Sequence, residues 1–77
     1  MAALVRFRKV AENSTAVRYE FGDDPGAFSR RLTVAKGPGT PVADDGLVDH
    51  TFLKASRKIN AMYAEAGQWP ERGMSAS

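Results

Sequence analysis

The sequence predicts an α+β domain: a three-stranded antiparallel β-meander, in strand order 1-2-3, with one C-terminal α-helix packed on one face. The first half of the chain contains short β-rich runs separated by turn-forming residues. The second half contains one amphipathic helical pattern. Because a small isolated sheet needs a cover for its apolar face, we expect the helix to lie across the sheet in a β-β-β-α fold.

The second run, TAVRYEFG, has the clearest strand pattern. Its apolar residues Val17, Tyr19 and Phe21 alternate with Arg18 and Glu20, which is typical of a half-buried strand. Short connections on both sides predict that this strand lies at the centre of the sheet. The expected boundaries are one domain over 1–69, with strands over approximately 3–12, 15–22 and 28–36, a loop over 37–46, a helix over approximately 47–66, and a flexible tail over 70–77.

The turn between the second and third strands predicts their register. The segment 24–27, Asp-Pro-Gly-Ala, suits a tight turn, because proline sets φ at the first central position and glycine tolerates positive φ at the second. Pairing back from this turn places apolar residues together on one face and opposite charges together on the other. The predicted pairs are Phe21 with Arg30, Glu20 with Arg31, Tyr19 with Leu32, and Val17 with Val34.

The first hairpin needs an irregularity. A two-residue turn at 13–14 pairs Val10 with Val17, but it places Phe7 opposite Glu20 on the wrong face. We predict a β-bulge at 8–9 that corrects this error. The bulge gives the pairs Phe7 with Tyr19 and Val5 with Phe21. A three-residue turn is the alternative, at the cost of moving Val10 to the other face.

These registers divide the side chains between two sheet faces. The apolar face is expected to carry Val5, Phe7, Val10, Val17, Tyr19, Phe21, Leu32 and Val34. The opposite face is expected to carry Arg6, Arg8 or Lys9, Arg18, Glu20, Arg31 and Thr33. The apolar face is the one that the helix should cover.

The C-terminal helix has recognisable ends. Asp45 or Asp49 can cap its start, and with Asp49 as the cap Val48 and Leu53 occupy the hydrophobic-staple positions. Gly67 is a natural stop, and the following Trp-Pro pair disfavours more helix. The stripe expected to face the sheet contains Val48, Phe52, Ala55, Ile59, Met62, Tyr63 and Ala66.

Composition excludes several kinds of site. The chain has 77 residues, which is enough for one small domain. It has no cysteine and only one histidine, so disulfides, Cys-based metal sites and His-rich metal sites are excluded. The sequence contains no nucleophile elbow, zinc-protease helix or phosphate loop, and His50 has no serine partner on its own helix face. We therefore predict no enzyme, no catalytic, cofactor-binding or metal-binding residues, and no small-molecule cofactor.

The chain also lacks a membrane signature. Its N-terminal apolar run is too short for a secretory signal, and no segment approaches the ~20 apolar residues of a membrane span. A cytoplasmic, soluble protein is expected.

The positive charge is concentrated in the first half. Residues 1–36 hold seven basic and four acidic side chains, whereas residues 37–77 hold four and five. On the outward sheet face, Arg6 and Arg31 are expected to flank Glu20 as a local ion-pair set. Arg18 is expected beside Arg8 or Lys9, where like charges would be relieved by an external anion. Splaying of these side chains into solvent is the competing interpretation.

Association with another protein is the other class of function. Leu53 on the flank of the helix stripe and Trp69 beyond its end are the candidate protein contacts, although Trp69 could instead fold back over the core. The basic side of the helix, with His50, Lys54, Arg57 and Lys58, is expected to be a solvated face. We therefore expect a small binding module that associates with a protein partner or with itself. The alternative is duplex nucleic-acid binding through the residues Arg6, Arg8, Lys9, Arg18 and Arg31.

Overall fold

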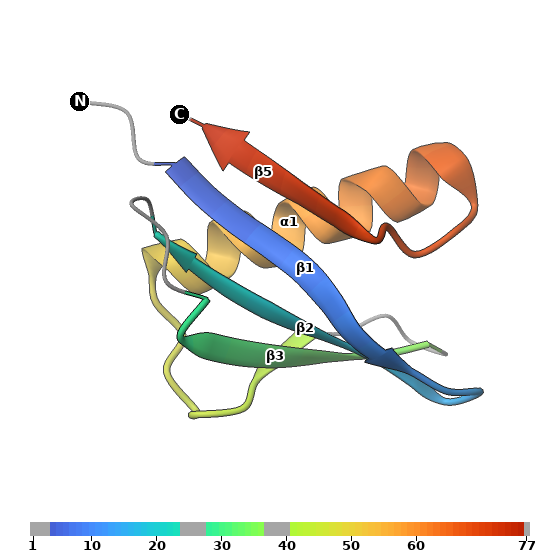
Figure 1. Cartoon of the computed structure of the whole chain (residues 1–77), viewed down its shortest axis with the longest axis horizontal. Helices are drawn as coiled ribbons and strands as arrows, with labels where there is room; N and C mark the ends of the chain where they lie inside the picture. Colours follow the sequence, from blue (N-terminus) through green and yellow to red (C-terminus); the bar gives the residue numbers. More distant parts are fainter. Residues whose placement is uncertain (1–3, 24–27, 37–40, 77) are drawn as a thin grey trace.

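Five antiparallel strands form one sheet, and a single helix packs on one face of it, in the computed structural model of the chain (Figure 1). The structure describes residues 4–23, 28–36 and 41–76. The elements are β1 (Leu4–Glu12), β2 (Ala16–Asp23), β3 (Arg30–Ala35), β4 (Pro41–Ala43), α1 (His50–Ala66) and β5 (Arg72–Ala76). The strand order across the sheet is β4-β3-β2-β1-β5, so β2 is central.

The α+β class, the C-terminal helix and the adjacent order of the first three strands are confirmed, but the sheet has five strands and not three. The predicted loop 37–46 contains β4, which pairs with β3. The predicted tail 70–77 contains β5, which pairs with β1 along its whole length. Neither segment has a strand pattern of its own, because β4 is only three residues long and β5 reads RGMSA.

The β2–β3 register is confirmed at each pair that the sequence predicts. Phe21 lies opposite Arg30, and the three other pairs follow in step: Glu20 with Arg31, Tyr19 with Leu32, and Val17 with Val34. The turn at 24–27 lies outside the described residues. The register counted back from that turn is the one observed, and it keeps apolar side chains together on one face.

The predicted pairing of the first hairpin is wrong in its position. A bulge does occur between β1 and β2, but it lies between Lys9 and Ala11, not at 8–9. Phe7 pairs with Phe21 and Val5 pairs with Asp23, two residues from the predicted partners, because the turn of the hairpin also lies one residue later than predicted. Val10 does not join the apolar face, because it occupies the bulge and its side chain is 47% exposed.

The turn of this hairpin is closed one residue later than the two-residue prediction. The N–H of Asn13 donates to the carbonyl oxygen of Ala16 at 2.9 Å, so Ser14 and Thr15 form the tip. The Asn13 side-chain oxygen accepts from the N–H groups of Thr15 and Ala16 at 2.8 and 2.9 Å. This side chain satisfies the turn backbone, as asparagine commonly does.

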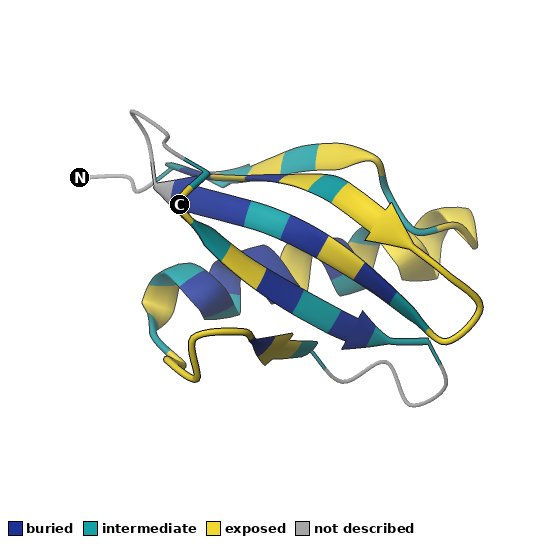
Figure 2. Ribbon diagram, turned by 60° about the horizontal axis from the view of Figure 1, so that its bottom comes forward, coloured by how far each residue is buried: buried dark blue, intermediate teal, exposed yellow. Residues whose placement is uncertain are grey.

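The core lies between the sheet and the helix. Alternate residues along β1, β2 and β3 are buried, as the bands in Figure 2 show. The buried apolar residues are Val5, Phe7, Val17, Tyr19, Phe21, Leu32, Val34, Ala43, Phe52, Ala55 and Ile59. Apart from Val10, the predicted apolar face is buried as expected.

The helix is capped at both ends by the residues that the sequence indicates. The Asp49 carboxylate accepts from the N–H of Phe52 at 3.0 Å, so Asp49 and not Asp45 is the N-cap. Gly67 has φ of 73°, and its N–H donates to the carbonyl of Tyr63 at 2.8 Å. Helical structure therefore begins at His50, three residues after the predicted start.

Only the central part of the predicted helix stripe is fully buried. Phe52, Ala55 and Ile59 are buried, and Met62 is partly buried against the core. The ends of the stripe are exposed: Val48 precedes the helix, and Tyr63 and Ala66 lie in its last turn. Lys54, expected on the solvated side, is only 8% exposed, whereas His50, Arg57 and Lys58 are exposed as predicted.

Candidate functional site

The sheet face turned away from the helix is rich in arginine, and we call it the outer face. The pairings place there the arginines Arg6, Arg8, Arg18, Arg31 and Arg72 and, among the acids, Glu20. Asp44 reaches the same face from the residue after β4, where it accepts from Thr33 Oγ1 at 2.9 Å. Positive charge therefore exceeds negative charge on the described part of this face.

Glu20 lies between two arginines, as predicted, although one of the two is not the predicted residue. Arg8 contacts it at 2.9 Å through Nε and Nη2, and Arg31 contacts it at 3.3 Å from the other side. The hydrogen bond from Arg8, with a smaller contribution from Arg31, lowers the pKa of Glu20. Arg8 takes the place expected for Arg6, because the hairpin turn lies one residue later than predicted and this moves the partners on β1 by two residues. One carboxylate thus serves two arginines.

The predicted like-charge cluster around Arg18 does not form. Arg18 lies opposite Ala11 and Thr33, and its guanidinium pairs with Asp44 at 2.5 Å. Asp44 is the anion that pairs with Arg18, and it could not be predicted there because it follows β4, a strand that the sequence pattern does not reveal. An external anion is therefore not needed to neutralise Arg18.

Two residues of like charge instead occupy opposite ladder positions where β1 meets β5. Arg72 lies directly opposite Arg8 in the pairing of these strands. Lys9 N–H donates to the Glu71 carbonyl, which makes the next residues, 8 and 72, a non-hydrogen-bonded pair with side chains close together. Arg8 is already engaged with Glu20, whereas Arg72 has no ion-pair or hydrogen-bond partner among the described residues.

A groove on the outer face contains this arginine pair. It has a volume of about 720 Å³, and its lining includes Arg6, Arg8, Arg72, Phe28, Met74 and Glu71. The Arg8 guanidinium lies over the Phe28 ring, 4.5 Å from its centroid. We call this the basic groove. Sequence reasoning found Arg6 and Arg8 but missed Arg72, because a residue in an expected tail has no assigned neighbours.

Lys9 is not part of the outer face. It pairs with Tyr19 on the helix side of β1, where its Nζ lies 2.6 Å from carboxylate oxygens of both Glu12 and Glu71. Lys36 adds a further contact to Glu12 at 2.7 Å. These hydrogen bonds raise the pKa of Lys9 and lower the pKa of Glu12 to about 2, with Lys36 the larger cause for Glu12.

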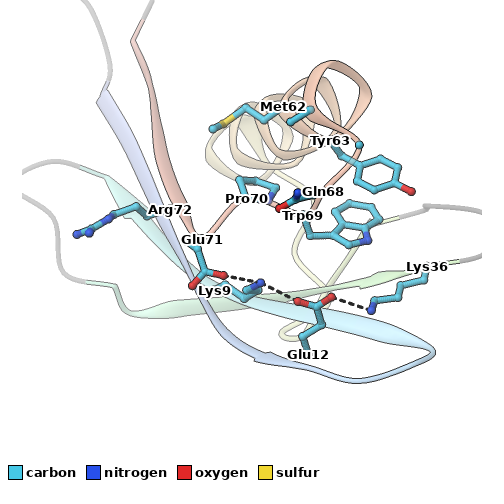
Figure 3. A pocket seen from close by; sticks show the side chains of 12 residues that line it. Lys9, Glu12, Lys36, Met62, Tyr63, Gln68, Trp69, Pro70, Glu71 and Arg72 are labelled. Carbon is cyan, nitrogen blue, oxygen red and sulfur yellow. Dashed lines mark hydrogen bonds and ion pairs between the residues drawn. The ribbon is translucent and has the colours of Figure 1, made fainter.

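A chain of alternating acidic and basic side chains forms the floor of a second pocket of about 660 Å³ at the open end of the core (Figure 3). Its members are Glu71, Lys9, Glu12 and Lys36. The opposite wall is aromatic. Tyr63 and Trp69 stack with ring centroids 4.0 Å apart and planes inclined by 14°. The charges of Lys9, Glu12, Lys36 and Glu71 are mutually paired, and Arg72, at the edge of the lining, is shared with the basic groove.

The two candidate protein contacts are both partly buried. Leu53 and Trp69 pack against the core cluster, and Trp69 also stacks on Tyr63. The competing interpretation, in which Trp69 folds back over the core, is therefore the one seen. Apolar side chains that are more exposed than these two lie elsewhere, for example Val42 on β4 and Met74 on β5.

Within the described residues, no group of three or more His, Cys, Asp or Glu side chains is placed to hold a metal ion. The helix of the described chain is not long and apolar enough to cross a membrane. No family model matches the chain, and neither a curated protein nor a solved structure matches it. Function must therefore be argued from the geometry of the molecule itself.

Proposed function

We propose that this protein is a non-enzymatic binding module that binds duplex nucleic acid through phosphate contacts on its outer face, centred on the basic groove. The observation that carries the proposal is the pair Arg8 and Arg72, placed directly opposite each other in the β1–β5 ladder. Like charges in such positions are destabilising. A phosphate between them would convert the repulsion into charge-assisted hydrogen bonds.

The surrounding side chains support the same ligand. Arg6 lines the same groove, and Arg31 lies on the same face beyond Glu20. Arginine forms bidentate contacts with phosphate oxygens. Glu71 also lines the groove, but its carboxylate contacts Lys9 on the helix side. The groove therefore retains an excess of positive charge.

The groove favours backbone contacts over stacking on bases. Two phenylalanines line the groove among the described residues: Phe7 is buried in the core, and Phe28 is already covered by the Arg8 guanidinium. Proteins that bind single strands use open aromatic platforms, which the described outer face does not provide. Phosphate contacts on a duplex fit this face better. They position a protein without reading sequence.

The sequence favours association with a protein partner, with Leu53 and Trp69 as the predicted contact residues. Both side chains are partly buried against the core, which leaves less of them for a partner. Nucleic acid, the alternative, is therefore the function that the geometry supports best.

The test is titration of the protein into a fluorescently labelled duplex, followed by anisotropy at several salt concentrations. Arg72→Glu should weaken binding about tenfold or more and reduce the salt slope by about one contact. The matched control is Arg57→Glu, an equal charge change on an exposed helix residue away from the outer face. Absence of binding at low salt, or equal weakening by both variants, would overturn the proposal.

Stability gives an independent reading of the same variant. Arg72→Glu places a carboxylate opposite Arg8, so the free energy of unfolding should rise by the few tenths of a kcal/mol typical of cross-strand charge pairs. Thermal unfolding should then occur at a slightly higher temperature. A variant that folds better but binds worse would show that the arginine pair serves a ligand and not the fold.

A further inference from the structure

The two edges of the sheet are built differently. At one edge, β4 is three residues long and begins with Pro41, which has no backbone N–H to offer. At the other edge, β5 is five residues long, contains no proline and pairs only with β1 in the described structure. Figure 1 shows β5 as the outermost strand beside β1. The β5 edge therefore lacks the blunting seen at the β4 edge.

The open edge presents a defined set of backbone groups. Lys9 and Glu71 form a hydrogen-bonded position of the β1–β5 ladder. Hydrogen-bonded pairs alternate in antiparallel ladders, so Gly73 and Ser75 direct their N–H and C=O groups toward β1. The backbone groups of Arg72, Met74 and Ala76 consequently point away from the sheet.

We propose that β5 pairs antiparallel with β5 of a second copy of this chain, in a register centred on Met74. The two sheets then become one continuous sheet related by a two-fold axis. In this register Met74 lies opposite Met74 of the other copy, and Arg72 lies opposite Ala76. Each of these residues both donates and accepts a backbone hydrogen bond, as in strand addition at other sheet edges.

The side chains fit this register better than one centred on Arg72. Met74 is 53% exposed on the outer face, and the pairing places its side chain against an identical apolar one. Arg72, the charged residue of β5, meets alanine and not arginine. A shift of two residues toward the start of β5 would instead bring Arg72 opposite Arg72, where like charges repel. The short segment RGMSA is therefore self-complementary about its centre.

The pairing has a consequence for the outer face. Both copies would present their basic grooves on the same side of the continuous sheet, on either side of the two-fold axis. The pairing itself does not rest on nucleic-acid binding, because it uses backbone groups and Met74 and no ligand.

Cross-linking tests the register directly, because the wild-type chain has no cysteine. Met74→Cys should oxidise to a disulfide-linked dimer, since hydrogen-bonded antiparallel pairs have Cα atoms ~5.5 Å apart, within disulfide range. The matched control is Val42→Cys, an equally exposed apolar position on the other edge strand. Dimer formation at least about tenfold faster for Met74→Cys is expected; equal rates would overturn the proposal.

Sedimentation equilibrium tests the association without cross-linking. The wild-type mass should rise above 8.3 kDa toward twice that value as concentration increases to about 1 mM. Met74→Glu places like charges together on the axis and should raise the dissociation constant at least about tenfold, whereas Val42→Glu should not. Circular dichroism confirms that both variants fold. A wild-type mass of 8.3 kDa throughout, or unchanged association of Met74→Glu, would overturn the proposal.

Discussion

The hydroxyl of Tyr19, in the central strand, donates a hydrogen bond to the backbone carbonyl of Pro70, with 2.6 Å between the two oxygens. The Tyr19 ring is fully buried and packs edge-on against Phe7, with centroids 5.6 Å apart. Burial, assisted by the carboxylates of Glu12 and Glu71, raises the pKa of Tyr19, so the hydroxyl stays protonated and remains a donor. One hydrogen bond thus connects the middle of the sheet to the segment that leads into β5.

Tyr19→Phe removes this hydrogen bond and leaves the Pro70 carbonyl without its partner. We expect the free energy of unfolding to fall by about 1 kcal/mol, because the hydrogen bond is partly buried. Urea denaturation measures this loss, and amide hydrogen exchange should accelerate more in β5 than in β3. Tyr63→Phe is the control, because Tyr63 is 38% exposed. Wild-type stability in Tyr19→Phe would show that this hydrogen bond does not anchor β5.

Gly73 gives β5 its close approach to the core. A Cβ at this position would lie 2.6 Å from Phe7 Cζ and 3.1 Å from Met62 Sδ. The Phe7 ring is buried and cannot move aside freely. Gly73→Ala should therefore cost about 1–3 kcal/mol of stability, as overpacking of a core usually does.

The matched control for Gly73→Ala is Ser75→Ala, two residues along the same strand on the same side. That change removes an oxygen and adds no volume, so a small effect is expected. Thermal unfolding followed by circular dichroism compares the two variants. Equal stabilities of Gly73→Ala and the wild type would mean that β5 does not pack as closely as the structure shows.

The parts of the fold that the sequence predicts are those determined by local pattern. The β2–β3 register follows from the turn sequence at 24–27 together with the alternation, because a slip of one residue would turn Tyr19 and Leu32 outward. The helix cap at Asp49 and the stop at Gly67 follow from short-range backbone chemistry. Each of these features depends on residues close together in the chain or on a single hairpin.

The parts that the sequence misses depend on distant partners. β5 has the composition RGMSA, which has little strand propensity, and it becomes a strand because β1 offers an edge some sixty residues earlier in the chain, as Phe7 pairs with Gly73. The bulge is misplaced for another reason. Moving it from 8–9 to Val10 keeps Phe7 buried in both cases, so the apolar pattern alone does not choose between the two positions.

The same two errors limit what could be predicted of the candidate site. The bulge sends Lys9 to the helix side, because a side chain changes face when the count along the strand shifts by one residue. The unrecognised β5 hides Arg72. Arg6, Arg8, Arg18 and Arg31 are correctly placed on the outer face, since their positions follow from the alternation of β1, β2 and β3.

Arg30 connects β3 to the start of the helix, and its removal should be costly. Its Nη1 contacts both carboxylate oxygens of Asp49 at 2.8 and 2.9 Å, its Nε contacts Asp45 at 2.9 Å, and its Nη2 donates to the Leu47 carbonyl at 2.8 Å. The guanidinium also lies over the Phe21 ring. We expect Arg30→Ala to lower the free energy of unfolding by about 2 kcal/mol.

A double-mutant cycle separates the ion pair from the helix cap. Asp49→Asn keeps a side-chain oxygen for the N–H of Phe52 but removes the charge that faces Arg30. The coupling free energy between Arg30→Ala and Asp49→Asn, measured by urea denaturation, should be about 0.5–1 kcal/mol. Additive effects would show that the charge of Asp49 contributes nothing to the link.

Acid should destabilise the fold through carboxylates whose pKa values lie below their ordinary values. The ammonium groups of Lys36 and Lys9 lower the pKa of Glu12 from 4.5 to about 2, and Arg8 and Arg31 lower that of Glu20. A depressed pKa in the folded state means that the unfolded chain binds protons first as the pH falls. The stabilisation is therefore complete above about pH 5, and it declines from there toward pH 2.

Glu12→Gln tests this assignment, because it removes the most strongly shifted of these two groups while preserving the shape of the side chain. The variant should be less stable than the wild type at pH 7, and the difference should shrink as the pH approaches 2, where the wild-type carboxylate also takes up a proton. Urea denaturation at several pH values between 2 and 7 follows both proteins. Parallel pH profiles would mean that the contacts of Glu12 with Lys9 and Lys36 do not stabilise the fold. In that case the acid sensitivity would have to arise from Glu20, Asp45 and Asp49, whose arginine partners also lower their pKa values.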